Sequence, residues 1–274
     1  MRTIPVALQL YTVRDMMQKD VPETLRAVKA IGYDYVEPAG LFGMSADAFR
    51  KALDDAGLTA VCAHVPLAEM SADTEKFISV YKTIGCKYVA VPYLPEEQRY
   101  GTPAFEATLA EIARIADMCL TAGMPLLYHN HDFEFTKMPD GRYVLDYMYD
   151  TIPALATELD LCWVRVGGED PAEYVRKYAH RAPVVHLKDY VGVKGEASPY
   201  ALLGQAEADG EKEQPAFAFR PFGHGCQDAE SIVLAGIESG ARWFVVEQDL
   251  SLERPPLEAA RMSIDTLREM GVKK

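Results

Sequence analysis

The segment LLYHNHDFEF, residues 126–135, places two histidines, an asparagine, an aspartate and a glutamate within ten positions. Its apolar start predicts a buried strand, and burial of so many polar groups is costly unless each has a partner. Side chains two residues apart on a strand face the same side, so His129 and His131 would point to one region. We therefore predict a shared polar pocket in which His129, His131 or His64 could act as a general base, because imidazole titrates near neutral pH.

Four residues at the ends of apolar runs could hold a metal ion. They are Glu134, Asp160, His186 and Glu247. Three carboxylates and one imidazole suit one divalent ion, namely Mn²⁺, Mg²⁺, Co²⁺, Fe²⁺ or Zn²⁺. Without a cation, carboxylates gathered in this way would raise one another's pKa. The sequence therefore predicts one divalent metal ion per chain.

Further polar side chains at strand ends could orient a hydroxylated substrate. They are Tyr11, Glu37, His64, Tyr93 and Lys188, with Arg220 and His224 from the region after the seventh strand. A few polar groups in a mostly apolar pocket usually fix the orientation of a ligand. Some could instead serve the fold alone, His64 as a hydrogen-bonded core histidine and Lys188 in an ion pair with Asp189.

Helices that end in glycine and are followed at once by an apolar run recur along the chain, as in AVKAIG-YDYVEP and VYKTIG-CKYVAVP. Glycine fits the left-handed residue that closes a helix, and continuous apolar runs are typical of parallel strands covered on both faces. The predicted strands lie near 5–11, 33–38, 58–65, 87–93, 125–131, 155–161, 184–189 and 243–249. This pattern predicts a single (β/α)8 TIM barrel over residues 1–274, whose site lies at the C-terminal strand ends.

The segment 190–222 interrupts the regular pattern after the seventh predicted strand and is rich in glycine and charge. Loops of this length in a compact domain are usually functional or mobile. We therefore expect an insertion that acts as a lid over the pocket mouth.

The composition narrows the possible partners. The net charge of −13 disfavours a protein that follows the phosphate backbone of nucleic acid. No apolar run is long enough to span a bilayer. The five cysteines form no CxxC pair, which favours reduced thiols and a cytoplasmic location. We expect a small-molecule carbohydrate substrate, no nucleic acid, no membrane and, as an open possibility, a homo-oligomer.

Several motifs together carry a resemblance that runs from about residue 3 to residue 272. They are YHNHDFEF, TELDLCW, VVHLKD and VVEQD, with QLYTVRD and YVEPAGLFG. The chain resembles the sugar phosphate isomerase/epimerase family of the xylose isomerase-like TIM barrel superfamily, which includes inosose dehydratase, ketose 3-epimerases, hydroxypyruvate isomerase and endonuclease IV. The resemblance implies that the family's metal ligands fall on the four residues named above, with His131 or His129 as alternatives to Glu134. It also implies that Glu134 and Glu247 transfer protons.

The predicted function is that of a metal-dependent isomerase or epimerase. It would transfer a proton next to a carbonyl of a sugar or polyol-derived substrate, with a metal that stabilises the resulting enolate. Elimination of water begins with the same proton transfer, so a sugar or inosose dehydratase is the alternative. A catalytically silent sugar-binding barrel is the third possibility.

Overall fold

The computed structural model describes residues 3–193 and 217–272, and most of the predicted lid, residues 194–216, lies outside the described residues. Parallel strands form one eight-stranded sheet in the order β3-β2-β1-β10-β7-β6-β5-β4. These strands are β1 (Val6–Gln9), β2 (Tyr35–Glu37), β3 (Thr59–Ala60), β4 (Val89–Val91), β5 (Leu126–His129), β6 (Ala156–Asp160), β7 (Val184–Leu187) and β10 (Trp243–Val246). Each lies within one of the predicted strand ranges.

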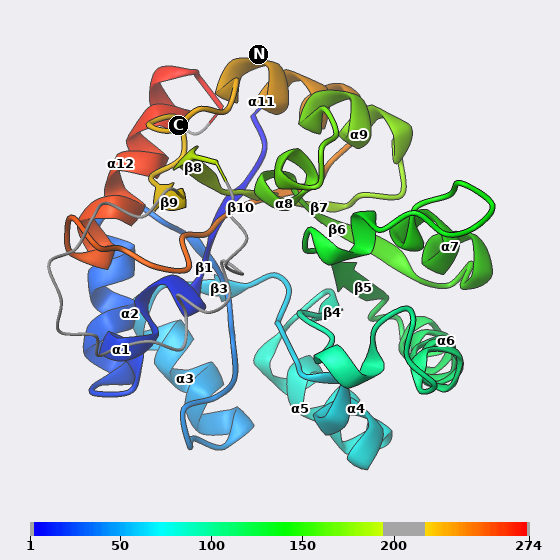
Figure 1. The fold of residues 1–274 in the computed structure, drawn as a ribbon. Coiled ribbons are helices and arrows are strands. Elements are labelled where there is room, and N and C mark those ends of the chain that lie inside the picture. The colour runs from blue at the N-terminus through cyan, green and yellow to red at the C-terminus, as the bar shows by residue number, and fades with distance from the viewer. Residues whose placement is uncertain (1–2, 194–216, 273–274) are drawn as a thin grey trace, which may run out of the picture.

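The two ends of this sheet meet through residues 61–65, which continue β3. The Ala90 amide donates to the Ala63 carbonyl at 2.8 Å, and the Val65 amide donates to the Ala90 carbonyl at 3.0 Å. These bonds close the sheet on itself, and Figure 1 shows the helices arranged around the strands. The predicted (β/α)8 barrel is thereby confirmed.

The helices follow the strands and cover the outside of the barrel. The α-helices are α1 (Arg14–Met17), α2 (Val21–Ala30), α3 (Ala46–Ala56), α4 (Leu67–Ala72), α5 (Thr74–Ile84), α6 (Phe105–Thr121), α7 (Val144–Thr151), α8 (Leu161–Val166), α9 (Pro171–Lys177), α11 (Ala229–Glu238) and α12 (Pro256–Glu269). Short 3-10 helices are η1 (Leu10–Val13), η2 (Glu96–Gln98) and η3 (Phe133–Phe135). Among the described helices, none is long and apolar enough to cross a membrane.

Local signals in the sequence set the helix ends. The Asp20 side chain accepts a hydrogen bond from the Glu23 amide at the start of α2, which satisfies a donor that the helix itself leaves open. Gly57 and Gly85 close α3 and α5 with φ angles of 69° and 98°. A side chain at either position would be strained in this left-handed conformation, so glycine is favoured there.

A short antiparallel hairpin, absent from the predicted elements, begins immediately after β7. It pairs β8 (Asp189–Gly192) with β9 (Phe217–Arg220), and Gly192 faces Phe217. The Asp189 carboxylate accepts backbone N–H groups from Gly223 and Gly225, both at 3.0 Å. A β-carbon on Gly225 would lie 2.1 Å from Asp189 Oδ1, so the chain can return this closely only with glycine.

Candidate metal centre and cavity

Inside the barrel, a layer of polar side chains at the C-terminal ends of the strands lies next to a cluster of apolar side chains. Small and apolar residues fill the interior at Ala7, Val61, Cys62, Tyr88, Ala90, Leu127, Val184 and Val245. Side chains two positions further along a strand point to the same side. Leu127 is thus followed by His129, and Val184 is followed by His186. The same spacing brings polar side chains from several strands into one layer at the C-terminal end.

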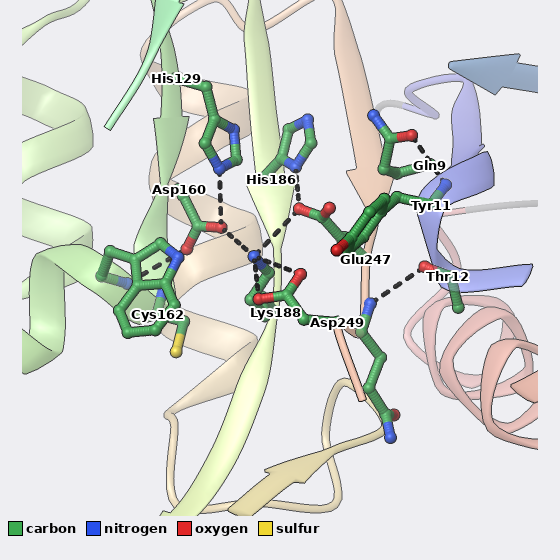
Figure 2. Close-up of polar contacts among 12 residues, drawn as sticks. Gln9, Tyr11, Thr12, His129, Asp160, Cys162, His186, Lys188, Glu247 and Asp249 are labelled. Atoms are coloured by element: carbon green, nitrogen blue, oxygen red, sulfur yellow. Dashed lines mark hydrogen bonds and ion pairs between the residues drawn. The ribbon is translucent and has the colours of Figure 1, made fainter. Parts of the chain in front are cut away.

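Four donor residues in this layer form what we call the outer group. They are His129, Asp160, His186 and Glu247, whose ligand atoms all lie within 4.8 Å of one another. His129 Nε2 is 3.5 Å from Asp160 Oδ2, and His186 Nδ1 is 3.0 Å from Glu247 Oε2. Figure 2 shows these side chains pointing toward a common centre from neighbouring strands.

Asp160 has two separate tasks. Its Oδ1 accepts the backbone N–H groups of Cys162 at 2.9 Å and Trp163 at 3.1 Å, and so caps helix α8. Its Oδ2 is buried and accepts no directed hydrogen bond from the described residues, although it forms an ion pair with Lys188. The helix therefore fixes the carboxylate in place while one oxygen remains aimed at the outer group.

Lys188 places a positive charge beside the outer group. Its Nζ lies 3.0 Å from carboxylate oxygens of Asp160, Glu247 and Asp249. Burial alone would lower the pKa of Lys188, but these carboxylates outweigh burial and raise the pKa well above its ordinary value. Burial acts in the opposite direction on Glu247, whose pKa is nevertheless held well below its ordinary value by Lys188 and His186. The Lys188 side chain is therefore protonated, and the Glu247 side chain is ionised, at neutral pH.

Carboxylates beneath the outer group contact the far side of each histidine ring. Glu158 Oε2 lies 3.2 Å from His129 Nδ1, and Glu37 Oε2 lies 2.7 Å from His186 Nε2. A carboxylate behind a metal-binding imidazole fixes the orientation and tautomer of the ring. Burial lowers the pKa of His129 to about 4, so its imidazole is neutral and can offer a lone pair at pH 7. Glu158 and Glu37 can thus orient the two histidines.

The donor chemistry of the outer group fits a divalent ion. Two imidazole nitrogens and two carboxylate oxygens suit Mn²⁺, Fe²⁺, Co²⁺ or Zn²⁺, and carboxylates also suit Mg²⁺. The oxygen of Asp160 that lacks a directed hydrogen bond is the type of buried polar atom that such an ion would satisfy. Three of the four predicted ligands, Asp160, His186 and Glu247, are brought together in this group.

Glu134, the fourth predicted ligand and a predicted base, is not part of this group. Helix η3 turns the chain away after β5, and the Glu134 carboxylate accepts hydrogen bonds from the Tyr128 hydroxyl at 2.5 Å and the His131 amide at 2.8 Å. It borders a separate small cavity beside Arg99. Burial raises the pKa of Glu134 to about 7. His129, one of the alternatives, stands where Glu134 was expected.

A cavity of about 520 Å³ opens above the outer group. It is lined by Tyr11, Ala39, Gly40, His64, Pro66, Glu69, Pro92, Tyr93, His129, His131, Lys188, Glu247 and Asp249. The predicted substrate-binding residues Tyr11, His64, Tyr93 and Lys188 all belong to its wall. The ring of His131 lies 5.3 Å from that of Tyr93 and 5.5 Å from that of Trp163. Burial lowers the pKa of His131 well below its ordinary value.

Three predicted substrate-binding residues lie away from the cavity. Arg220 forms an ion pair with Glu253 at 2.6 Å. His224 is exposed, and its Nε2 lies 3.2 Å from Thr266 Oγ1 on α12. Glu37 lies in the buried layer beneath the outer group and is 0% exposed. These three residues are therefore not part of the cavity wall in the part of the chain that the structure describes.

Two residues of the site were not assigned a role from the sequence. Glu158 lies two positions before Asp160, and Asp249 lies two positions after Glu247. Both therefore face the barrel interior with a predicted ligand. Burial raises the pKa of Asp249 to about 7. The two-residue spacing from a predicted ligand was the signal that could have identified both.

Comparison with known proteins places this geometry in context. The chain is 26% identical over 261 residues to an inosose dehydratase of Geobacillus kaustophilus. This alignment covers 85% of this chain and 82% of that protein. A sugar phosphate isomerase/epimerase from Parabacteroides distasonis has a similar fold, with a TM-score of 0.75, 20% identity and coverage of 100% of this chain and 96% of that chain.

A xylose isomerase-like TIM barrel protein from Mycobacterium smegmatis, solved in complex with magnesium, also has this fold. The TM-score is 0.70 and the identity 18%, with coverage of 98% of this chain and 97% of that chain. The family model for the xylose isomerase-like TIM barrel matches residues 25–270. This match agrees with the resemblance carried by the sequence motifs, and the chain belongs to the xylose isomerase-like TIM barrel family.

Proposed function

We propose that this protein is a metal-dependent enzyme that transfers a proton at a carbon next to a carbonyl of a sugar or polyol-derived substrate, giving isomerisation or epimerisation. The outer group at the floor of a polar-lined cavity carries this proposal. His129, Asp160, His186 and Glu247 would hold one divalent ion. When bound there, the ion would supply Lewis-acid polarisation of a carbonyl and so acidify the neighbouring C–H bond.

Two side chains on different strands can exchange protons with a substrate in the cavity. Glu247, at the end of β10, is ionised and can accept a proton. His131, beyond β5, is neutral because burial lowers its pKa, and a neutral imidazole can accept a proton or donate its N–H. Groups on two sides of one carbon would permit removal of the proton from one face and its return to another.

The charges of the cavity favour a substrate without a phosphate group. Among the described lining residues, Lys188 is the one lysine or arginine, and it is paired with three carboxylates. Glu69 and Glu247 add negative charge to the wall. Before the charge of a bound ion is counted, this wall would repel a phosphate, whereas the hydroxyl groups of a neutral polyol can donate hydrogen bonds to it.

Dehydration of a keto-polyol is the second candidate function. The similarity to an inosose dehydratase favours it, as does the presence of Asp249 beside Lys188. A carboxyl group with a pKa of about 7 can be protonated at neutral pH. Asp249 could therefore donate a proton to a departing hydroxyl after Glu247 has accepted one from carbon.

A solvent-exchange experiment tests both candidates. The chelator-stripped protein would be incubated in D₂O with ketoses and inososes, each with Mn²⁺, Mg²⁺, Co²⁺ and Zn²⁺ in turn, and followed by proton NMR. We expect metal-dependent entry of deuterium next to the carbonyl, with a new sugar isomer for the first candidate or a dehydrated product for the second. Exchange that is equally fast without metal, or in Asp160→Asn, would overturn the proposal.

A further inference from the structure

A second set of donor atoms lies on the inner side of the same two histidines. We call it the inner group, and it consists of His64, His129, Glu158 and His186, whose ligand atoms also lie within 4.8 Å of one another. Glu158 Oε2 lies 2.6 Å from His64 Nε2 and 3.2 Å from His129 Nδ1. It is 3.4 Å from His186 Nε2. The three imidazole nitrogens thus gather around one carboxylate oxygen, and the four donors are close enough together to bind one ion.

The inner group differs from the outer group in its donor chemistry. It offers three imidazole nitrogens and one carboxylate oxygen, a set of four that suits tetrahedral Zn²⁺. Cys62 Sγ lies 3.3 Å from the other oxygen of Glu158 and adds a soft atom nearby. The outer group offers two nitrogens and two oxygens and borders the cavity. The outer donors can also bind zinc, but their larger share of oxygen atoms and their place at the cavity favour harder ions such as Mn²⁺ and Mg²⁺, which retain water or substrate oxygen as further ligands.

His129 and His186 face the two groups through opposite ring nitrogens. His129 presents Nδ1 to Glu158 and Nε2 to Asp160. His186 presents Nε2 to Glu158 and Nδ1 to Glu247. A neutral imidazole has one nitrogen with a lone pair, while the other nitrogen carries the proton. Each histidine can therefore serve one group at a time.

We propose that the barrel contains two mutually exclusive positions for one divalent ion, an inner position that takes Zn²⁺ and an outer position that takes Mn²⁺ or Mg²⁺. His64 belongs to the inner group and also lines the cavity, so an ion can reach the inner position from the cavity. An ion in the inner position withdraws both shared histidines from the outer one. Zinc would therefore inhibit the manganese-dependent reaction, and this last consequence alone rests on the proposed function.

Anomalous diffraction from crystals of the wild-type chain tests the positions directly. Crystals would be prepared with ZnCl₂ alone or MnCl₂ alone, and data collected at the absorption edge of each metal. We expect the zinc peak between His64 and Glu158 and the manganese peak between Asp160 and Glu247. A zinc peak between Asp160 and Glu247, or zinc peaks at both positions in one molecule, would overturn the proposal.

Calorimetric titration of two variants gives an independent test in solution. His64→Asn alters the inner group alone, and its matched counterpart Asp160→Asn alters the outer group alone. After removal of metal, His64→Asn should weaken zinc binding at least about tenfold and leave manganese binding unchanged, with the reverse for Asp160→Asn. If Asp160→Asn weakens both metals and His64→Asn weakens neither, one outer site is present.

The outcome can be separated from that of the proposed function. Solvent exchange by the manganese-loaded wild-type protein tests the reaction, whereas the diffraction experiment tests where zinc binds and needs no substitution. Zinc in the outer position together with manganese-dependent exchange would refute the two positions and leave the reaction standing. Zinc in the inner position without exchange under any metal would do the opposite.

Discussion

The inner and outer groups use the same two histidines in different surroundings. On the inner side, Glu158 and Glu37 are 0% exposed and meet the rings within the closed barrel. On the outer side, Glu247 lines a cavity and shares Lys188 with Asp160. Donors at the cavity wall can exchange water, ions and substrate directly, whereas the buried inner donors exchange them by way of His64, which borders both the cavity and the inner group. The comparison shows how one imidazole can be held firmly by one nitrogen and remain available through the other.

Loss of a shared histidine should have the largest effect, because it removes a donor from both groups. We expect His186→Gln to abolish the metal-dependent rise in melting temperature with both Mn²⁺ and Zn²⁺ and to reduce metal affinity by about 10²-fold or more. Activity should fall below detection. Calorimetry and thermal melts with and without metal measure this, and unchanged binding of both metals would show that neither group is a metal site.

A cavity residue outside both groups should affect the reaction without affecting the metal. We expect His131→Asn to lower kcat by about 10²–10⁴-fold, the usual contribution of a general acid or base, while manganese affinity stays unchanged. Deuterium exchange measured at saturating Mn²⁺ checks this expectation. A loss of metal binding in this variant would move His131 from proton transfer into the ligand set.

Removal of an orienting carboxylate should have an intermediate effect. Glu158→Gln leaves all outer ligands in place but removes the charge behind His129, so manganese affinity should fall by about 10–100-fold. Glu69→Gln is the matched control, because Glu69 lines the cavity but belongs to neither group. Equal manganese affinity in Glu158→Gln and the wild type would show that the inner side does not set the orientation of His129.

Glu134 should have the smallest effect on metal binding and a distinct effect on stability. Its pKa is raised from 4.5 to about 7 in the folded chain. Between these values the folded state binds more protons than the unfolded state, so its contribution to stability is lost as pH rises from about 4.5 through 7. Glu134→Gln should remove about 2 kcal/mol of the stability difference between pH 5 and pH 8.

Urea unfolding at the two pH values measures this difference, and manganese titration of the same variant supplies the control. We expect unchanged manganese affinity, because Glu134 contacts Tyr128 and His131 rather than the outer group. A loss of manganese affinity comparable to that of Glu158→Gln would instead indicate that Glu134 is a ligand of the metal ion.

The fold could be predicted because the same local sequence pattern, a helix closed by glycine and followed by an apolar run, recurs in successive helix–strand units. Glycines such as Gly57 and Gly85 do close helices, and the apolar runs after them do form parallel strands. The β8–β9 hairpin was not predicted, because its pairing joins residues on either side of a long intervening segment. Long-range pairing of this kind leaves little trace in local periodicity.

The candidate site could be predicted only where a ligand ends a regular strand. Asp160, His186 and Glu247 meet because parallel strands carry their C-terminal ends to one place. Glu134 does not join them, because η3 changes the side-chain period immediately after β5. Spacing places Glu158 on the same side of β6 as Asp160. Its contact with His129 depends on the distance to the neighbouring strand, which spacing within one strand does not contain.

The hairpin has a further consequence for how the segment between β8 and β9 can vary in length. Gly192 and Phe217 are paired, and Asp189 ties the returning chain back to the end of β7. The connection between β8 and β9 therefore starts and finishes at one anchored point. Each doubling of a flexible loop adds only about 0.6 kcal/mol of closure entropy. Segments of very different length could therefore be exchanged between β8 and β9, while the barrel that carries them keeps nearly the same stability.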